Sequence, residues 1–215
     1  MSPAIADPHG TQPVRHLGAK LEDARAVMVL LHGRGATAAD ILGLAREIGD
    51  PEVAYLAPDA ERHTWYPYSF LAPIEENEPY LSSALRKIAS VIESVVAAGV
   101  SRERIAIAGF SQGACLTTEF VARHAGRYGA VIALTGGLIG PPGTKFEYAG
   151  SLEGTPAFFG SGDPDPHVPW ARVQESAVVY EKLGAVVRVK RYPGMPHTVS
   201  REELEITREM LAEVG

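Results

Sequence analysis

Ser111 lies in the segment of the sequence best suited to covalent chemistry. Residues 109–113 read Gly-Phe-Ser-Gln-Gly, which matches the pattern G-x-S-x-G. In that pattern the serine occupies a sharp turn between a strand and a helix, so its hydroxyl stands clear of the sheet, and the glycines let strand and helix approach each other. An apolar, strand-like stretch precedes the segment and a helix-forming stretch follows it. This context favours a nucleophilic serine over a structural glycine turn with an ordinary surface serine.

A serine hydroxyl is a weak nucleophile and needs a base that a third group holds in place. Of the seven histidines, His197 lies on a loop between the last predicted strand and the last predicted helix. His32 ends a strand inside a glycine-rich turn, where a histidine more often anchors the turn than acts as a base. His167 is two residues from Asp165 and is poorly placed to connect that carboxylate to Ser111. We therefore predict that His197 is the base.

Two aspartates, Asp163 and Asp165, lie on the loop 161–169 and compete for the third role. Each precedes a proline, which biases its backbone towards an extended conformation. Side chains two residues apart in an extended loop tend to point the same way. Local chemistry therefore leaves both aspartates open as the partner of His197.

Strands and helices alternate along the chain. Apolar runs and alternating patterns predict strands over 26–31, 53–57, 104–108, 130–134, 156–160 and 186–192. Helical spacing, capping signals and glycine stops predict helices from Thr37 to about Gly49, over 81–96, 114–125 and 171–183, and after Ser200. Crossovers of this length imply an α/β fold with a mostly parallel sheet covered on both faces. Each motif above falls on a loop beyond the carboxyl end of a strand, where such sheets gather functional residues.

The bulk composition is that of an ordinary soluble protein. The chain has 215 residues, of which 46% are apolar and 21% charged, and a net charge of −6. This predicts a single domain, 14–215, behind a loose and flexible tail, 1–13. No Lys/Arg cluster indicates a nucleic-acid partner, and no signal peptide or stretch of ~18 apolar residues is present. We therefore expect a cytoplasmic protein without stable membrane anchoring.

Cys115 is the only cysteine and lies four residues after Ser111. A lone cysteine forms no intrachain disulfide and no zinc site of several thiolates, which fits a reducing compartment. Cys115 could act as a second nucleophile or be a small, buried thiol of the core. The buried thiol is the favoured interpretation.

Four motifs in this order, HGRGA, GFSQG, GDPDPHVP and GMPH, resemble the phospholipase/carboxylesterase family of α/β-hydrolases, which includes acyl-protein thioesterases and small bacterial carboxylesterases. The resemblance covers almost the full chain and implies the α/β-hydrolase fold. The family pattern G-x-x-D-x-x-V-P fits residues 162–169 with Asp165 as its aspartate. The resemblance therefore implies that Asp165 orients His197, while Asp163 would accept backbone N–H bonds and shape the loop.

The resemblance also implies an oxyanion hole made by the backbone N–H groups of Arg34 and Gln112, which follow the H-G pair and the nucleophile. Two fixed donors of this kind would stabilise a carbonyl oxygen as it becomes an oxyanion. The arginine side chain is not needed for that role. The side chain of Arg34 could bind an acidic group of the substrate or simply be solvated, and the sequence does not choose between these roles.

The segment 63–71 reads His-Thr-Trp-Tyr-Pro-Tyr-Ser-Phe-Leu, whereas thioesterase-like members usually carry Trp-Phe-Asp there. We predict that its aromatic residues Trp65, Tyr66 and Phe70 form an apolar wall or lid over the substrate pocket, in preference to a loop that packs its own aromatics. The departure disfavours acyl-protein thioesterase activity.

Together these features predict a serine hydrolase that cleaves carboxylic esters through an acyl-enzyme, with Ser111, Asp165 and His197 as a catalytic triad. Thioester or lysophospholipid hydrolysis on the same triad is the alternative. A non-catalytic ligand-binding member of the fold is disfavoured because all three residues are present. We expect no cofactor and no metal, since no His/Asp cluster has ligand spacing. The expected partner is a small-molecule ester, and a homodimer is compatible with the sequence.

Overall fold

The computed structural model describes residues 6–215. Within that range seven strands form one sheet in the order β1-β3-β2-β4-β5-β6-β7. They are β1 (Val14–Gly18), β2 (Ala26–Leu31), β3 (Val53–Pro58), β4 (Ile105–Phe110), β5 (Ala130–Leu134), β6 (Pro156–Asp163) and β7 (Val186–Pro193). All neighbouring strands are parallel except β1, which runs antiparallel to β3. The predicted mostly parallel sheet is confirmed.

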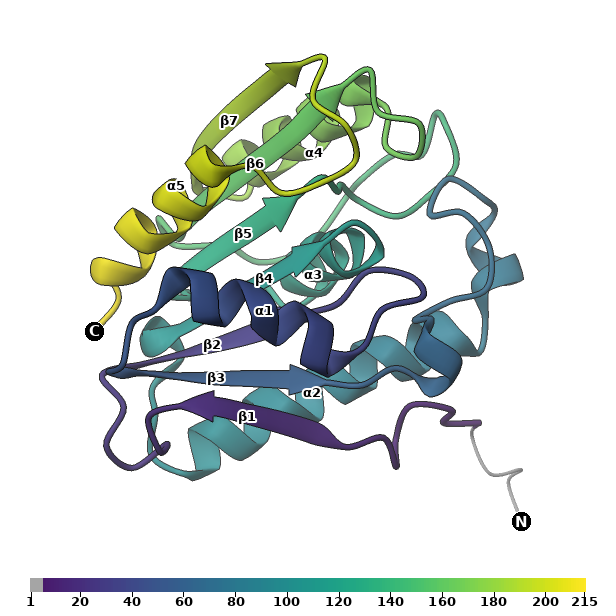
Figure 1. The fold of residues 1–215 in the computed structure, drawn as a ribbon. Helices are drawn as coiled ribbons and strands as arrows, with labels where there is room; N and C mark the ends of the chain where they lie inside the picture. The colour runs from purple at the N-terminus through teal and green to yellow at the C-terminus, as the bar shows by residue number, and fades with distance from the viewer. Residues whose placement is uncertain (1–5) are drawn as a thin grey trace.

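Helices cover both faces of the sheet (Figure 1). The described α-helices are α1 (Ala38–Ile48), α2 (Tyr80–Ala97), α3 (Gln112–Arg123), α4 (Trp170–Lys182) and α5 (Arg201–Ala212). α1 and α5 pack against one face, and α2, α3 and α4 pack against the other. Because the central strands are covered on both sides, every residue of β2 is buried, which explains its continuous apolar sequence.

The helix starts predicted at Thr37 and Ser200 are confirmed, and each is a capping box. At α1 the Thr37 side chain accepts the Asp40 backbone N–H, and the Asp40 carboxylate accepts the Thr37 backbone N–H. Ser200 and Glu203 make the same reciprocal pair at α5. The second box fixes the end of the loop that follows β7, which is the loop that carries His197.

β1 is a strand that the apolar pattern does not reveal. Its sequence Val-Arg-His-Leu-Gly contains two polar residues, and it is partly exposed along its length. It lies at the edge of the sheet, where backbone hydrogen bonds to β3 rather than a buried apolar run hold it in place.

Residues 6–13 differ from the loose tail expected for this region, because His9 is fully buried. Its Nδ1 accepts the Glu61 backbone N–H at 3.0 Å, and its Nε2 bonds to the Trp65 carbonyl at 3.0 Å. The His9 backbone N–H donates to Ser83 Oγ on α2 at 2.9 Å. These contacts join distant parts of the chain, so a local sequence pattern does not predict them. The rest of the expected tail, 1–5, lies outside the described residues.

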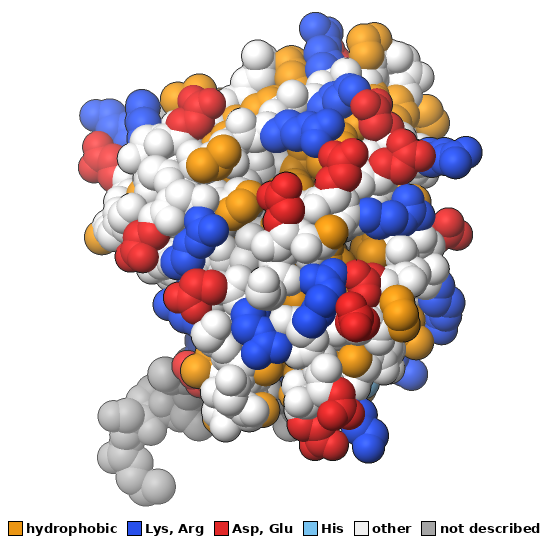
Figure 2. Space-filling view, turned by 90° about the vertical axis from the view of Figure 1, so that its left-hand side faces the viewer, with side chains coloured by type: hydrophobic (Ala, Val, Ile, Leu, Met, Phe, Trp, Pro, Cys, Tyr) orange, Lys and Arg blue, Asp and Glu red, His pale blue; other side chains and the backbone are white. Residues whose placement is uncertain are grey.

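The surface carries both signs of charge. Figure 2 shows one face of the molecule, on which Lys and Arg side chains are interspersed with Asp and Glu. Among residues 6–215, none of the helices has both the length and the apolar composition needed to cross a membrane.

Candidate active site

Ser111 occupies the sharp turn between β4 and α3, with φ 55° and ψ −117°. A positive φ in a residue with a Cβ costs on the order of 1–3 kcal/mol, so its surroundings must hold it. The Ser111 backbone N–H donates to the Leu134 carbonyl of β5 at 3.0 Å. A Cβ on Gly109 would overlap the backbone of Gly113, and one on Gly113 would overlap the backbone of Leu31. Strand, turn and helix approach one another so closely here that no side chain fits, and glycine is therefore required at both positions.

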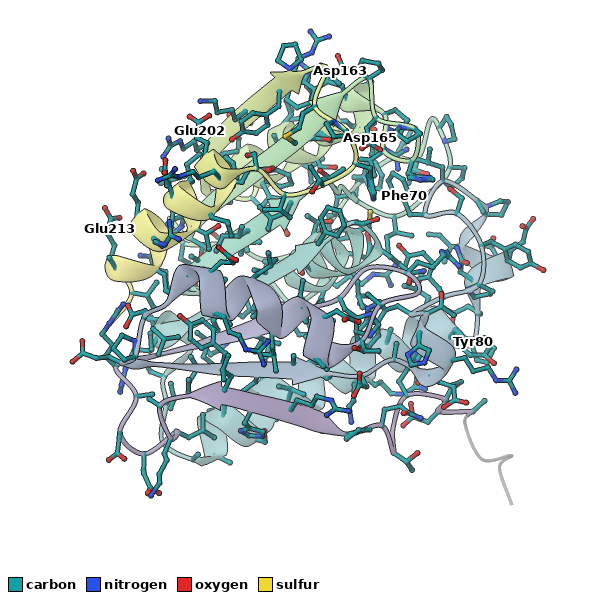
Figure 3. All side chains as sticks on the ribbon, in the orientation of Figure 1. Phe70, Tyr80, Asp163, Asp165, Glu202 and Glu213 are labelled. Carbon is teal, nitrogen blue, oxygen red and sulfur yellow. The ribbon has the colours of Figure 1, made fainter. Side chains whose placement is uncertain are left out.

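His197 and Asp165 join Ser111 in a continuous line of hydrogen bonds. His197 Nε2 lies 2.9 Å from Ser111 Oγ, and His197 Nδ1 lies 2.7 Å from Asp165 Oδ2. The three residues come from loops that follow β7, β6 and β4, which end at the same edge of the sheet. Figure 3 shows Asp165 on the loop beyond β6, at the same end of the molecule as Phe70.

The side chain of Asp165 is buried, and both of its carboxylate oxygens accept hydrogen bonds. Its Oδ1 accepts the backbone N–H groups of His167 and Val168, each at 2.8 Å. Burial by itself raises the pKa of Asp165, but the bonds from the His167 backbone, the His197 ring and the Val168 backbone together hold that pKa below its ordinary value. An ionised Asp165 fixes the tautomer in which His197 Nδ1 carries the proton and Nε2 accepts one.

Asp163 has a different partner. Its side chain forms an ion pair with Arg191 on the neighbouring strand β7. This ion pair takes the place of the backbone N–H bonds expected for Asp163. The structure therefore brings Asp165, and not Asp163, to His197.

The backbone N–H groups of Arg34 and Gln112 donate no hydrogen bond within the described part of the chain. Gln112 is the first residue of α3, so its N–H points out of the helix start, where negative charge is favoured. Arg34 follows Gly33, and a Cβ on Gly33 would touch the side chains of Phe110 and Ser111. Both N–H groups thus belong to turns that adjoin the serine.

His32 anchors the turn that carries Arg34, which agrees with the interpretation favoured from the sequence. Its Nε2 accepts the Ala60 backbone N–H at 3.1 Å, and its Nδ1 lies 2.8 Å from the Gly33 carbonyl. Burial lowers the pKa of His32, which keeps the ring neutral.

A cavity of about 430 Å³ opens beside Ser111. Its walls are formed by Arg34, Tyr66, Pro67, Tyr68, Ser69, Phe70, Ser111, Gln112, Cys115, His167, Val168 and His197. Tyr66 and Phe70 are two of the three predicted pocket residues. Of the other wall residues outside the triad and the oxyanion pair, Pro67, Tyr68 and Ser69 belong to the same segment 63–71 as Tyr66 and Phe70. His167 and Val168 come from the loop after β6, and Cys115 comes from the first turn of α3.

Trp65, the third predicted pocket residue, does not line the cavity, and that prediction is wrong. Its side chain is fully buried. Its Nε1 donates to the His32 carbonyl at 2.9 Å, and its ring packs against the His32 ring at a centroid distance of 5.0 Å. Trp65 therefore supports the turn that carries Arg34. Residues 65–68 form consecutive bends, so a simple alternation along the segment does not predict which of its side chains line the cavity.

The Arg34 side chain holds the segment 64–68, which we call the aromatic segment. Its Nη1 donates to the Pro67 carbonyl at 2.7 Å and to Thr64 Oγ1 at 3.2 Å, and its Nη2 donates to the Tyr68 carbonyl at 2.6 Å. The sequence left the role of this guanidinium open. In the structure it binds the wall of the cavity.

The Gln112 side chain also binds the aromatic segment, through Trp65 and Tyr66, which Arg34 does not contact by hydrogen bonds. Its Oε1 accepts the Trp65 backbone N–H at 2.9 Å, and its Nε2 donates to the Tyr66 carbonyl at 2.8 Å. The two residues whose backbone N–H groups adjoin Ser111 therefore also fix the cavity wall through their side chains.

Cys115 is buried, and its pKa is raised to about 12 by that burial. The thiol is therefore neutral and a poor nucleophile, although it borders the cavity. No three His, Cys, Asp or Glu side chains of residues 6–215 gather as ligands of a metal ion would.

On a sheet of this topology, a serine at a strained strand-to-helix turn that is linked through histidine to a buried carboxylate defines a serine hydrolase of the α/β-hydrolase class. The chain belongs to the phospholipase/carboxylesterase family, whose model matches residues 16–214.

Similarity to individual proteins supports this assignment. The crystal structure of a phospholipase/carboxylesterase from Dyadobacter fermentans is 44% identical and superposes with a TM-score of 0.90, covering 94% of this chain and 97% of that one. Acyl-protein thioesterase 1 of Saccharomyces cerevisiae is 29% identical over 210 residues, which are 88% of this chain and 92% of the yeast protein. The carboxylesterase of Bacillus cereus, 20% identical with a TM-score of 0.75 over 96% of each chain, shares the fold.

Proposed function

We propose that this protein hydrolyses carboxylic esters of small molecules through an acyl-enzyme intermediate. The observation that carries the proposal is the unbroken line of hydrogen bonds from Asp165 through His197 to Ser111, at the wall of a cavity. Membership of the phospholipase/carboxylesterase family and the relatives that bear carboxylesterase names support the same reaction.

In the first half of the reaction, Ser111 Oγ attacks the ester carbonyl carbon while His197 Nε2 takes the hydroxyl proton. The carbonyl oxygen becomes an oxyanion, which accepts hydrogen bonds from the backbone N–H groups of Arg34 and Gln112. The C–O bond to the alcohol then breaks, and the alcohol leaves with the proton from His197. Asp165 remains ionised and stabilises the imidazolium that forms in between.

In the second half, a water molecule replaces the alcohol. His197 removes a proton from the water as its oxygen attacks the acyl carbon. The second tetrahedral intermediate uses the same two N–H donors, and its collapse releases the acid while His197 returns the proton to Ser111. The cycle consumes one water and one ester, and it restores the serine.

Thioester hydrolysis is a second candidate, because the yeast relative is named an acyl-protein thioesterase. The same residues would act on a thioester carbonyl. A direct comparison of an ester and a thioester that share one acyl group separates the two candidates.

The experiment compares purified wild type with Ser111→Ala on p-nitrophenyl esters of several chain lengths, one acyl thioester and one lysophospholipid. We expect Ser111→Ala to lower kcat by at least about three decades with an unchanged fold, because the nucleophile is lost while binding groups remain. Ser94→Ala, an exposed serine on α2, serves as the control. A fluorophosphonate should label wild type on Ser111. A folded Ser111→Ala that keeps more than a few per cent of the activity would refute the assignment.

We also propose a cytoplasmic location, which the single free thiol of Cys115 supports because it does not require an oxidising compartment. Fractionation of the native host with an antibody to the protein tests this.

A further inference from the structure

His167 is an exposed residue of the cavity wall that the reaction above does not use. It lies on the loop between β6 and α4 and borders the same cavity as Ser111 and His197. Its backbone N–H donates to Asp165 Oδ1 at 2.8 Å, whereas its ring makes no hydrogen bond with any residue of the described range 6–215. Because the residue is exposed, its imidazole is open to a molecule bound in the cavity.

Contact with His197 places the His167 ring at the reacting centre. The centroids of the two imidazoles are 4.9 Å apart, and their planes meet at 74° in an edge-to-face arrangement. His197 Nε2 is in turn 2.9 Å from Ser111 Oγ. Asp165 holds both residues, since one of its oxygens accepts the His167 backbone N–H and the other bonds to the His197 ring. The His167 ring therefore adjoins the base that the reaction uses.

The course of the reaction assigns this side of the cavity to the alcohol part of the ester. In the tetrahedral intermediate the oxyanion points towards the backbone N–H groups of Arg34 and Gln112. The ester oxygen of the alcohol must come within about 3 Å of His197 Nε2 to receive its proton. The alcohol part therefore extends from the carbonyl carbon on the side of His197. A side chain that packs against His197 borders this part of the substrate.

The surroundings of His167 favour an uncharged group that both donates and accepts a hydrogen bond. A neutral imidazole has one donor nitrogen and one acceptor nitrogen. Asp165 lies two residues before His167, and its lowered pKa keeps it ionised. Its negative charge disfavours a second anion close by. A hydroxyl group can bond to either ring nitrogen and adds no charge.

We infer that His167 is a specificity-determining residue whose ring hydrogen-bonds a hydroxyl group in the alcohol part of the substrate. The substrate class is then esters in which a small diol or triol is the leaving alcohol, in preference to esters of plain alkanols. The inference rests on the proposed ester hydrolysis and adds the chemistry of the alcohol. One hydrogen bond between neutral groups changes a binding constant by roughly two- to tenfold, which sets the scale of the expected selectivity.

The test uses three esters. The 2-hydroxyethyl and propyl esters of butanoic acid share the acyl part and have alcohol parts of equal length, whereas propyl hexanoate differs from propyl butanoate in the acyl part alone. Acid release at constant pH gives kcat/KM for each ester, which is divided by its rate constant for hydroxide hydrolysis. The alcohol ratio compares hydroxyethyl with propyl butanoate, and the acyl ratio compares propyl butanoate with propyl hexanoate. We expect a wild-type alcohol ratio above one.

His167→Phe removes the ring nitrogens but keeps an aromatic ring beside His197 and keeps the backbone N–H that Asp165 accepts. We expect this variant to lower the alcohol ratio by at least about threefold and to leave the acyl ratio within about twofold of wild type. His16→Phe makes the same change at an exposed position of β1 outside the cavity wall and is the matched control. It should alter neither ratio. Circular dichroism checks that all variants are folded.

Three outcomes overturn the inference. The first is a wild-type alcohol ratio of one or less. The second is a His167→Phe enzyme in which the alcohol ratio is unchanged or both ratios change equally. The third is a loss of kcat on all three esters in His167→Ala while His167→Phe matches wild type, because the ring would then only support His197 by packing.

Failure of the inference is distinct from failure of the proposed function. Hydrolysis of the three esters that depends on Ser111, with no preference for the hydroxyl group, would refute only the role of His167. Absence of any hydrolysis that depends on Ser111 would refute the proposed function itself.

Discussion

At the residue scale, two aspartates only two positions apart have separate partners. Asp165 gives one carboxylate oxygen to the backbone N–H groups of His167 and Val168 and the other to His197. Asp163 pairs with Arg191 on the surface of the sheet edge. The Asp163 pair is partly exposed, and exposed ion pairs contribute little to stability.

We predict that Asp165→Asn lowers kcat by about three to four decades, because an amide at this position favours the wrong tautomer of His197. Asp163→Asn should lower kcat by at most about tenfold, since its side chain does not touch the histidine. Steady-state kinetics of both variants, with circular dichroism to confirm equal folding, measures the difference. If Asp163→Asn is the more damaging change in a folded protein, the triad must be reassigned.

At the scale of elements, the aromatic segment 64–68 is held by residues from two other elements. The Arg34 guanidinium comes from the turn after β2, and the Gln112 amide comes from the start of α3. Both residues also supply the proposed oxyanion donors through their backbones. The cavity wall and the N–H groups at Ser111 are therefore positioned by the same two residues.

We predict that Arg34→Ala lowers kcat/KM for small esters by roughly tenfold, mainly through KM. The variant keeps its backbone N–H, but the aromatic segment loses three hydrogen bonds, each worth about 0.5–1.5 kcal/mol. Arg34→Lys should fall between wild type and Arg34→Ala, because an ammonium cannot reproduce the planar fork that reaches several oxygens. Arg46→Ala, an exposed residue of α1, is the control. A change of kcat/KM smaller than twofold in Arg34→Ala would count against the role of the Arg34 side chain in holding the aromatic segment.

At the scale of the whole molecule, the chain before β1 supports the back of the aromatic segment. The buried ring of His9 bonds to the Trp65 carbonyl and to the Glu61 backbone N–H. Burial lowers the pKa of His9, although the carbonyl of Trp65 and the nearby carboxylates of Asp7 and Glu61 oppose that effect. The ring is neutral when it makes both bonds, because a protonated Nδ1 could not accept the Glu61 N–H.

This burial makes folding sensitive to pH. A histidine in the unfolded chain has a pKa of about 6.5, whereas the native pKa of His9 lies lower. Below pH 6.5 the unfolded state therefore binds more protons than the native state, and stability is lost as the pH falls. Between pH 7.5 and pH 5.5 the loss from one histidine is at most about 1.4 kcal/mol.

His9→Gln isolates this contribution, because glutamine offers one donor and one acceptor but does not titrate. Urea unfolding at both pH values should show wild type losing more free energy of unfolding than His9→Gln on acidification. The other buried groups, His32 and Glu203 among them, are common to the two proteins and cancel in the comparison. His16→Gln, at an exposed position of β1, should behave like wild type. Equal losses in wild type and His9→Gln would contradict the prediction.

The sequence by itself determined the features that depend on residues close together in the chain. Apolar runs specified the buried strands, the spacing of Gly109, Ser111 and Gly113 specified the strained turn, and pairs three residues apart specified both capping boxes. These features are local because a strand face, a tight turn and a helix start are each built from a few consecutive residues.

Only the tertiary structure decided which side chains meet across the fold. The sequence placed Trp65 in the pocket and His9 in a loose tail, but a bond between residues 56 positions apart joins the two behind the cavity wall. The guanidinium of Arg34 found its acceptors 30 or more positions away, and local chemistry did not separate Asp163 from Asp165. Such contacts depend on where the sheet brings distant loops together, and alternation along a single loop does not reveal which of two neighbouring side chains faces the cavity.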